Sequence, residues 1–189
     1  GLVGVSDRDG SVYDYFRDRL IFPIEDPRGQ VIGFGARALG EVKPKYLNSP
    51  ESPSFVKKSV LYGWSRARKA ARRGLPVIVV EGYMDVIAVS SSNVAAAVAP
   101  LGTALGEDQF RLLWKLSNDP VLCFDGDKAG QTAAQRAIER VLPLLEPGRS
   151  VRLAVLPEGQ DPDDILRQKG PDGLRRIFNA ATGLLDSLW

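Results

Sequence analysis

Short apolar runs alternate with helical patterns in the part of the chain that follows Pro76. Four runs rich in β-branched residues occupy positions 77–80, 94–98, 121–124 and 151–156. Each run is long enough for one buried strand, and a helical pattern separates it from the next. This alternation predicts parallel strands joined by crossover helices that cover both faces of a sheet. The predicted fold class is therefore α/β.

The helical patterns between and after these strands have recognisable ends. Thr103 is suited to cap the second of them, and Glu146-Pro147-Gly148 ends the third. An acidic turn with Pro162 follows the fourth strand, and a proline in that place favours a helix start. The predicted helices cover residues 83–91, 105–116, 129–145, a stretch up to 169, and 172–188.

The first part of the chain has a different pattern. Apolar runs at 20–24 and 30–36 flank Glu25-Asp26-Pro27-Arg28-Gly29, whose proline and glycine suit a turn, so an antiparallel hairpin is predicted. Residues 40–59 form a long connection, and residues 65–73 form a short, strongly basic helix that ends at Gly74. We therefore expect a smaller α+β subdomain before the parallel sheet and further helices after it.

Composition removes several chemistries. The chain has 189 residues, 44% of them hydrophobic, a net charge of +2, one cysteine and no histidine. An internal disulfide, a histidine-based triad and a zinc site of Cys and His are thus excluded within these residues. Cys123 lies in an apolar strand and is expected to be a buried filler. No apolar run approaches membrane-spanning length and no signal peptide is recognisable, so we expect a cytoplasmic protein without membrane contact.

Two aspartates follow the third strand of the sheet. Asp125 and Asp127 flank Gly126, and alternation along a strand would turn both carboxylates to the same side. Gly126 is expected to leave the backbone open to a ligand. Hard oxygen ligands without histidine or thiolate favour Mg²⁺ or Mn²⁺. A helix cap or a solvated turn is the alternative for an isolated pair of this kind.

Further carboxylates follow the neighbouring strands. Glu81 comes after the first strand, and Asp161 and Asp163 come after the fourth. Because ligands of an open parallel sheet bind at the carboxyl ends of its strands, three acidic turns at one edge predict a divalent-metal site suited to phosphoryl transfer. Glu81 is either a ligand or an acid or base. Asp85 is either a partner of the ligands or a carboxylate favoured by the helix dipole.

The long connection at 40–59 combines basic and aromatic residues. Lysines interleaved with a tyrosine suit single-stranded nucleic acid, with lysines on phosphates and Tyr46 stacked on a base. From the residues alone a solvated loop is the better interpretation, because charge runs are common on protein surfaces. The residues concerned are Lys43, Lys45, Tyr46, Asn48, Lys57 and Lys58.

Two stretches are similar to the motifs of a known family. Glu81-Gly82-Tyr83-Met84-Asp85-Val86 and Phe124-Asp125-Gly126-Asp127-Lys128-Ala129-Gly130 resemble the two motifs of a Toprim domain, which bacterial primases, topoisomerases and some nucleases share. Other stretches resemble the DnaG-type bacterial replicative primase in particular. They lie at residues 22–24, 31–37, 44–51, 61–63, 100–105 and 161–164.

The resemblance implies an RNA polymerase that makes short primers on a single-stranded DNA template from ribonucleoside triphosphates. It implies that Glu81, Asp125 and Asp127 are catalytic. With Asp161 and Asp163 these residues would hold Mg²⁺ or Mn²⁺, and Asp85 would stand beside them. It also reverses the interpretation of the long connection as a solvated loop. The residues implied to handle nucleotides and template are Arg37, Lys45, Tyr46, Asn48 and Lys57.

One departure from the family pattern concerns the end of this connection. The family usually has glycine after the second lysine, and this chain has Lys58 there, so the choice between Lys57 and Lys58 stays open.

The resemblance also implies a division of the chain. Residues 1–74 would be part of the N-terminal subdomain of a primase core, 75–160 a Toprim domain, and 161–189 the start of a helical subdomain. Zinc would belong to a further N-terminal domain, and the replicative helicase would bind a further C-terminal one. We expect a monomer, a fragment of a longer bacterial protein of the replication fork, that primes poorly alone.

Two rival functions remain from the residues. One is a Toprim nuclease or topoisomerase fragment that cleaves DNA. The other is a non-catalytic module that binds nucleic acid through the long connection alone.

Overall fold

The computed structural model describes residues 2–102, 104–184 and 186. The chain divides into two compact units, Gly1–Val56 and Lys57–Trp189. The basic helix after residue 64 therefore belongs to the second unit. The three-part division with boundaries after residues 74 and 160 stays a prediction.

The first unit is built on a hairpin and one added strand. Strands β3 (Arg19–Glu25) and β4 (Val31–Ala38) pair antiparallel, which confirms the predicted hairpin. The Asp26 carboxylate holds its turn by accepting hydrogen bonds from the amides of Arg28 and Gln30 at 2.8 and 2.9 Å. Strand β5 (Tyr46–Asn48) pairs with β4, so the predicted long connection contains a strand. Strands β1 (Val3–Val5) and β2 (Val12–Asp14) form a separate antiparallel pair.

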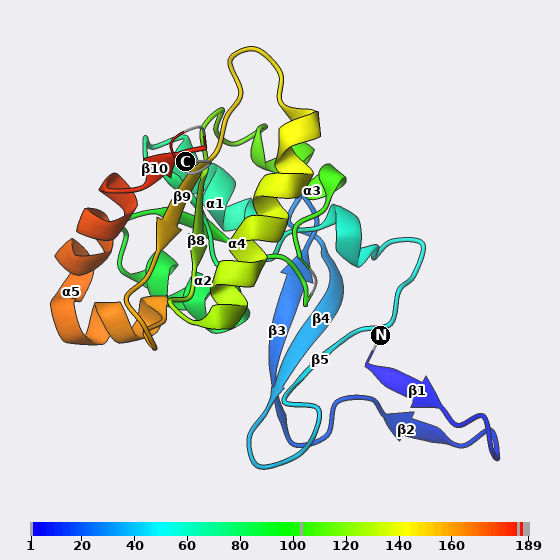
Figure 1. Cartoon of the computed structure of the whole chain (residues 1–189). Helices are drawn as coiled ribbons and strands as arrows, with labels where there is room; N and C mark the ends of the chain where they lie inside the picture. The colour runs from blue at the N-terminus through cyan, green and yellow to red at the C-terminus, as the bar shows by residue number, and fades with distance from the viewer. Residues whose placement is uncertain (1, 103, 185, 187–189) are drawn as a thin grey trace. The chain divides into compact units, whose positions relative to one another are not determined.

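The second unit is built on a five-stranded sheet in which four strands are parallel (Figure 1). The strand order is β10-β9-β8-β6-β7, and the strands from β6 to β9 pair in parallel as predicted. Edge strand β10 pairs antiparallel with β9 and was not predicted. The bounds are β6 (Val77–Val79), β7 (Ala96–Val98), β8 (Val121–Phe124), β9 (Arg152–Val155) and β10 (Thr182–Gly183).

Helices connect these strands at the expected places. They are α1 (Trp64–Ala71), α2 (Tyr83–Ser91), α3 (Glu107–Leu113), α4 (Lys128–Val141) and α5 (Pro162–Asn179), with 3₁₀ turns η1 (Lys57–Ser59) and η2 (Leu142–Leu144). Gly106 caps α3, and Thr103, the predicted cap, lies outside the described residues. No helix within the described residues is long and apolar enough to cross a bilayer.

The end of α5 differs from the prediction. Gly170, with φ 65° and ψ −172°, interrupts the helix before Pro171, so the predicted break between 169 and 172 is present. The second segment ends at Asn179 and not at 188. Here the chain leaves the helix because Thr182 and Gly183 pair with Leu153 and Arg152 along the open edge of the sheet. The hydrogen bonds of an added edge strand replace those of a longer helix.

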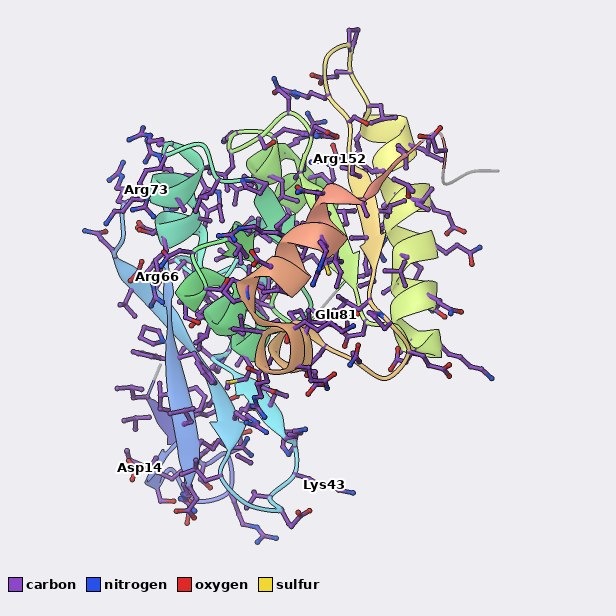
Figure 2. All side chains as sticks on the ribbon, turned by 90° about the vertical axis from the view of Figure 1, so that its left-hand side faces the viewer. Asp14, Lys43, Arg66, Arg73, Glu81 and Arg152 are labelled. Carbon is purple, nitrogen blue, oxygen red and sulfur yellow. The ribbon has the colours of Figure 1, made fainter. Side chains whose placement is uncertain are left out.

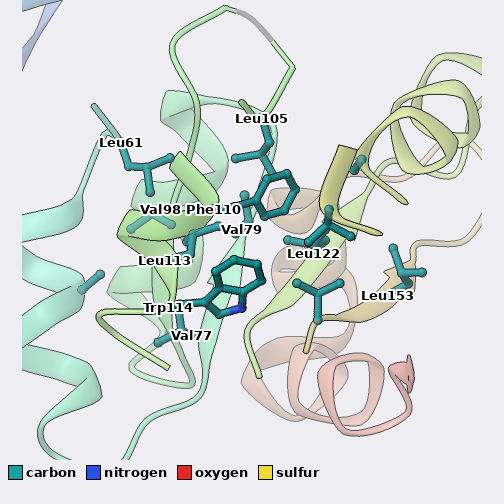
Figure 3. Packing of buried hydrophobic residues seen from close by; sticks show 14 of the residues in the cluster. Leu61, Val77, Val79, Val98, Leu105, Phe110, Leu113, Trp114, Leu122 and Leu153 are labelled. Atoms are coloured by element: carbon teal, nitrogen blue, oxygen red, sulfur yellow. The ribbon is translucent and has the colours of Figure 1, made fainter. Parts of the chain in front are cut away.

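Apolar side chains on both faces of the sheet are covered by helices. Alternate residues such as Val77, Val79 and Leu122 pack with α1, α3 and α4 in the cluster shown in Figure 3. The residues between them, including Ile78 and Cys123, are also buried and lie on the other face, beneath α2 and α5. Helices thus cover both faces, as the sequence predicted, and leave the strand ends free to carry the site.

Candidate metal centre and nucleic-acid interface

Acidic residues follow three adjacent strands of the second unit. Glu81 comes two residues after β6, Asp125 directly follows β8, and Asp161 lies in the turn between β9 and α5. The parallel register of β6 with β8 and of β8 with β9 brings the carboxyl ends of these strands to one edge. The structure therefore gathers at this edge the carboxylates that the sequence predicted there.

A hydrogen bond joins two of these turns. The backbone N–H of Asp125 donates to Oε1 of Glu81 at 3.2 Å. The backbone N–H of Gly82 donates to Oδ2 of Asp85 at 3.0 Å, which fixes Asp85 in the first turn of α2. Both links orient carboxylates through backbone groups and leave further carboxylate oxygens for other ligands.

The electrostatics show how closely these carboxylates act on one another. Burial and, after it, the negative charges of Glu81, Asp85, Asp161 and Asp127 together raise the pKa of Asp125 to about 7. Burial likewise raises the pKa of Asp85 to about 6, with smaller contributions from other carboxylates, the largest from Asp161. The edge is therefore a site of unbalanced negative charge that a cation would relieve.

Three of the predicted ligands also serve local structure. Asp127 caps α4, with its Oδ1 accepting a hydrogen bond from the amide of Gly130 at 2.7 Å. Asp161 caps α5 in the same way through the amide of Asp164 at 2.8 Å. Asp163 forms an ion pair with Arg167 one helical turn later. The capping role considered for an isolated aspartate pair is thus real for Asp127.

Glycine is required at position 126 for a different reason from the one expected. A Cβ atom at this position would overlap the carbonyl oxygens of Leu156 and Pro157. The glycine thus lets the turn after β8 press against the turn after β9, and it does not leave the backbone open to a ligand. This close approach brings Asp125 towards the chain segment that leads to Asp161.

The donor set fits a hard divalent cation. Among residues 2–102, 104–184 and 186, no three His, Cys, Asp or Glu side chains stand in an arrangement that holds a metal ion as they are. The candidate ligands are nevertheless all carboxylates, which Mg²⁺ and Mn²⁺ prefer. To bind one ion together, Asp127 and Asp161 would share their oxygens between the cation and the backbone amides that they now cap.

The residues of the first unit that are predicted to handle nucleotides and template lie on or next to neighbouring strands. Arg37 on β4 is the register partner of Tyr46 on β5, so their side chains share one face of the sheet. Asn48 lies two residues after Tyr46 on the same face, and Lys45 directly precedes β5. Tyr46 is exposed, and Nε of Arg37 is buried without a hydrogen-bond acceptor among the described residues. A phosphate oxygen would satisfy this donor.

Lys57 belongs to the second unit, which it begins in the turn η1, whereas the other four residues belong to the first unit. A residue that the sequence reasoning missed holds this turn. Gln109, fully buried, donates from Nε2 to the carbonyls of Lys57 and Val60 at 3.2 and 2.8 Å. Its Oε1 accepts from the amide of Gly106 at 3.0 Å. Glutamine three residues after a glycine helix start is a capping signal that could have marked it.

Comparisons with known proteins agree with this geometry. The profile of the DNA primase catalytic core, N-terminal domain, matches residues 1–68, and that of the Toprim domain matches residues 76–154. The DNA primase of Pseudomonas aeruginosa is 51% identical over 187 residues, which are 98% of this chain and 28% of that protein. The chain thus spans less than a third of this relative.

Solved structures show the same fold. A crystal structure of a DNA primase domain from Pseudomonas aeruginosa has a TM-score of 0.93 at 48% identity and covers 100% of this chain and 59% of that one. The structure of a DnaG primase catalytic domain bound to ssDNA has a TM-score of 0.88 at 42% identity, with coverage of 99% and 61%.

The parallel sheet with acidic turns at one edge is a Toprim domain, a class whose primase members are metal-dependent. Together with the match of the first 68 residues, this assigns the chain more narrowly. It belongs to the DnaG family of bacterial DNA primases, as part of the catalytic core.

Proposed function

We propose that this chain carries the centre of a primase that synthesises short RNA primers on single-stranded DNA from ribonucleoside triphosphates. The reaction is a nucleotidyl transfer that depends on Mg²⁺ or Mn²⁺. The observation that carries the proposal is the gathering of carboxylates from three turns at one end of the parallel strands, where burial and then the charges of its neighbours raise the pKa of Asp125 to about 7. Such an arrangement is costly for a fold unless cations bind there.

Each acidic residue has a part in the proposed site. Glu81, Asp125, Asp127, Asp161 and Asp163 would hold the metal. When bound, such ions neutralise the negative charge of a transferring phosphate. Glu81 orients the amide of Asp125 and, being exposed, is also able to exchange a proton with a reacting group. Asp85 stands beside the ligands and adds negative charge that strengthens cation binding.

The first unit supplies the proposed contacts to polyphosphate and template. Arg37 offers an unsatisfied donor, and Tyr46 offers an exposed ring beside it. Lys45 and Asn48 flank that ring along β5. This combination suits a phosphate backbone with a stacked base. Lys57, in the second unit, is proposed to contact phosphate as well.

Several parts of the proposal concern the longer protein. Zinc would be held by a separate N-terminal domain, since these residues include one cysteine and no histidine. The replicative helicase would bind through a separate C-terminal domain. We place the protein at the replication fork in the bacterial cytoplasm and expect this chain to be monomeric and to prime poorly without its neighbouring domains.

Calorimetric titration of Mn²⁺ tests the metal site. Asp127→Asn removes the charge while asparagine keeps the cap of α4, so a loss of affinity cannot be assigned to helix fraying. We expect at least about tenfold weaker binding, the effect of losing a ligand or its close support. Asp108→Asn, in the exposed first turn of α3, is the matched control and should bind as the wild type does. Equal binding by Asp127→Asn would remove this residue from the site.

The rival functions give other results. A nuclease would cleave single-stranded DNA in the presence of the metal, whereas the proposed enzyme elongates a primer when ribonucleotides are supplied. A non-catalytic binding module would bind no metal, and its DNA affinity would be unchanged in Asp125→Asn.

A further inference from the structure

Helix α1 and the turn that follows it carry positive charges that the proposed reaction does not use. Arg66 and Lys69 lie three residues apart on one side of α1, and Arg73 lies in the turn just after the helix ends at Ala71. All three are exposed, and Figure 2 labels the first and last of them on the second unit. We call these three residues the basic stripe.

The charges of the basic stripe are not balanced within the described residues. No ion pair joins any of the three to a carboxylate there. The first turn of α1 contains no acidic residue, and the neighbouring Arg68 lies over the ring of Trp64 at 5.5 Å. The helix dipole favours Lys69 in the last turn of α1 and Arg73 just after it, but it opposes Arg66 in the first turn, which also lies three residues from the like charge of Lys69. A structural role therefore does not account for Arg66.

The basic stripe borders a hollow that also offers neutral polar groups. A cavity of about 250 Å³ is lined by Arg66, Lys69 and Arg73 and also by Ser90 of α2 and Asn93 just after that helix. The segment from Ser90 to Asn93 brings no carboxylate to the hollow. Cations together with hydroxyl and amide groups are the usual partners of phosphate oxygens.

This hollow lies at the amino ends of the parallel strands, and the carboxylates lie at their carboxyl ends. Ala95 and Ala96, at the start of β7, line the hollow, whereas Glu81 and Asp125 follow the ends of β6 and β8. The register pairs Ala96 with Val77, the first residue of β6. A group bound at the basic stripe is therefore not the group that reacts at the metal site.

We propose that the basic stripe binds the phosphate backbone of the single-stranded DNA template at a position away from the reacting end. From Arg66 to its end at Ala71 the helix alone rises about 7.5 Å, roughly two nucleotides at 3.4 Å each, and Arg73 follows that end, so the three charges extend further than one isolated phosphate needs. This site deepens the proposed function and rests on it, since it requires that the chain binds single-stranded DNA.

The test compares DNA binding of the wild-type chain with that of Arg66→Gln/Lys69→Gln/Arg73→Gln. Glutamine has a helix propensity close to that of arginine and lysine, so α1 is preserved, as the unfolding temperature should verify. For an oligonucleotide of about 30 nucleotides, the slope of log affinity against log salt should become shallower by about 2, or about 0.7 for each lost phosphate contact. Affinity for Mn²⁺ should not change.

Two controls make the result specific. Lys115→Gln/Lys169→Gln/Arg176→Gln removes three exposed positive charges elsewhere in the second unit and should leave the slope unchanged. Equal slopes for the two triple variants would reduce the effect to net charge and overturn the proposal. Equal losses for DNA and for a ribonucleoside triphosphate would indicate a nucleotide site, which also overturns it.

Failure of the basic stripe and failure of the proposed function are distinguishable. If Lys45→Gln weakens DNA binding while the stripe variant binds as the wild type does, only the stripe is wrong. If the wild-type chain binds no single-stranded DNA at all, the proposed function is wrong and the stripe proposal is overturned with it.

Discussion

The backbone amide of Asp125 donates a hydrogen bond to Oε1 of Glu81 at 3.2 Å, although 44 positions separate the two residues. The contact exists because β6 and β8 are neighbours in the sheet and end at the same edge. It brings a carboxylate towards the aspartate whose own pKa is raised to about 7. The site therefore holds negative charges together by backbone geometry, at a cost in stability when all of them are ionised.

That cost predicts an unusual pH dependence of the metal-free chain. The pKa of Asp125 is about 7 and that of Asp85 about 6 in the folded chain, against 3.8 for an ordinary aspartate. The folded state thus binds more protons than the unfolded state between about pH 4 and 7, so its free energy of unfolding should rise as the pH falls from about 8 to about 5. The chain has no histidine to oppose this trend. Urea unfolding at each pH measures it.

Asp85→Asn checks the source of this effect. Asparagine keeps an oxygen for the amide of Gly82 but carries no charge, so the variant should be more stable than the wild type at about pH 8 and show a flatter profile. Added Mg²⁺ should flatten the wild-type profile as well, because it neutralises the same charges. A wild-type stability that increases from about pH 5 to pH 8 would contradict the assignment.

The repeating strand and helix pattern was sufficient to predict the parallel sheet, because strands that alternate with helices usually pair in parallel, with the helices covering both faces. The acidic edge followed from the same pattern, since Glu81, Asp125 and Asp161 each come after a strand. Gly126 was misinterpreted because the backbone atoms that require a glycine there belong to Leu156 and Pro157, about 30 residues away in the sequence. A contact of that kind has no local signal.

The short elements were harder to predict for a related reason. Strand β5 and strand β10 contain three and two residues, too few to show a periodicity, and they exist because β4 and β9 offer open edges. Residues of η1 are fixed by Gln109 from a different helix. Which residues hold the metal, and which bind nucleotides, stays a prediction.

Gly126→Ala should damage the site more than the fold. Its Cβ would overlap the carbonyl oxygens of Leu156 and Pro157, so the turn carrying Asp125 must move away from the turn before α5. We expect a loss of about 1–3 kcal/mol in the free energy of unfolding and weaker Mn²⁺ binding in calorimetry. Gly40→Ala is the control, since no atom lies within 4 Å of its added carbon. Unchanged metal affinity in Gly126→Ala would show that the approach of the two turns is unimportant.

Gln109→Ala tests the link between α3 and the Lys57 turn. The substitution leaves the carbonyls of Lys57 and Val60 and the amide of Gly106 without this partner in a buried environment. We expect the free energy of unfolding to fall by about 3 kcal/mol in urea titration. Gln135→Ala, on the exposed side of α4, should change it by less than about 0.5 kcal/mol. Similar values for both variants would mean that water replaces the side chain of Gln109.

Tyr46 distinguishes base stacking from simple charge attraction in the first unit. Its exposed ring lies on the same sheet face as Arg37, so a base that stacks on it would leave its phosphate near the unsatisfied Nε of that arginine. Tyr46→Ala should weaken binding of single-stranded DNA by about 1–3 kcal/mol in fluorescence titration, with an unchanged salt slope, whereas Tyr46→Phe keeps the ring and should bind nearly as the wild type does. Lys45→Ala should instead flatten the salt slope by about 0.7, because it removes a phosphate contact and no stacking surface. If Tyr46→Ala and Lys45→Ala change the slope equally, the ring contributes no stacking, and charge alone accounts for the binding.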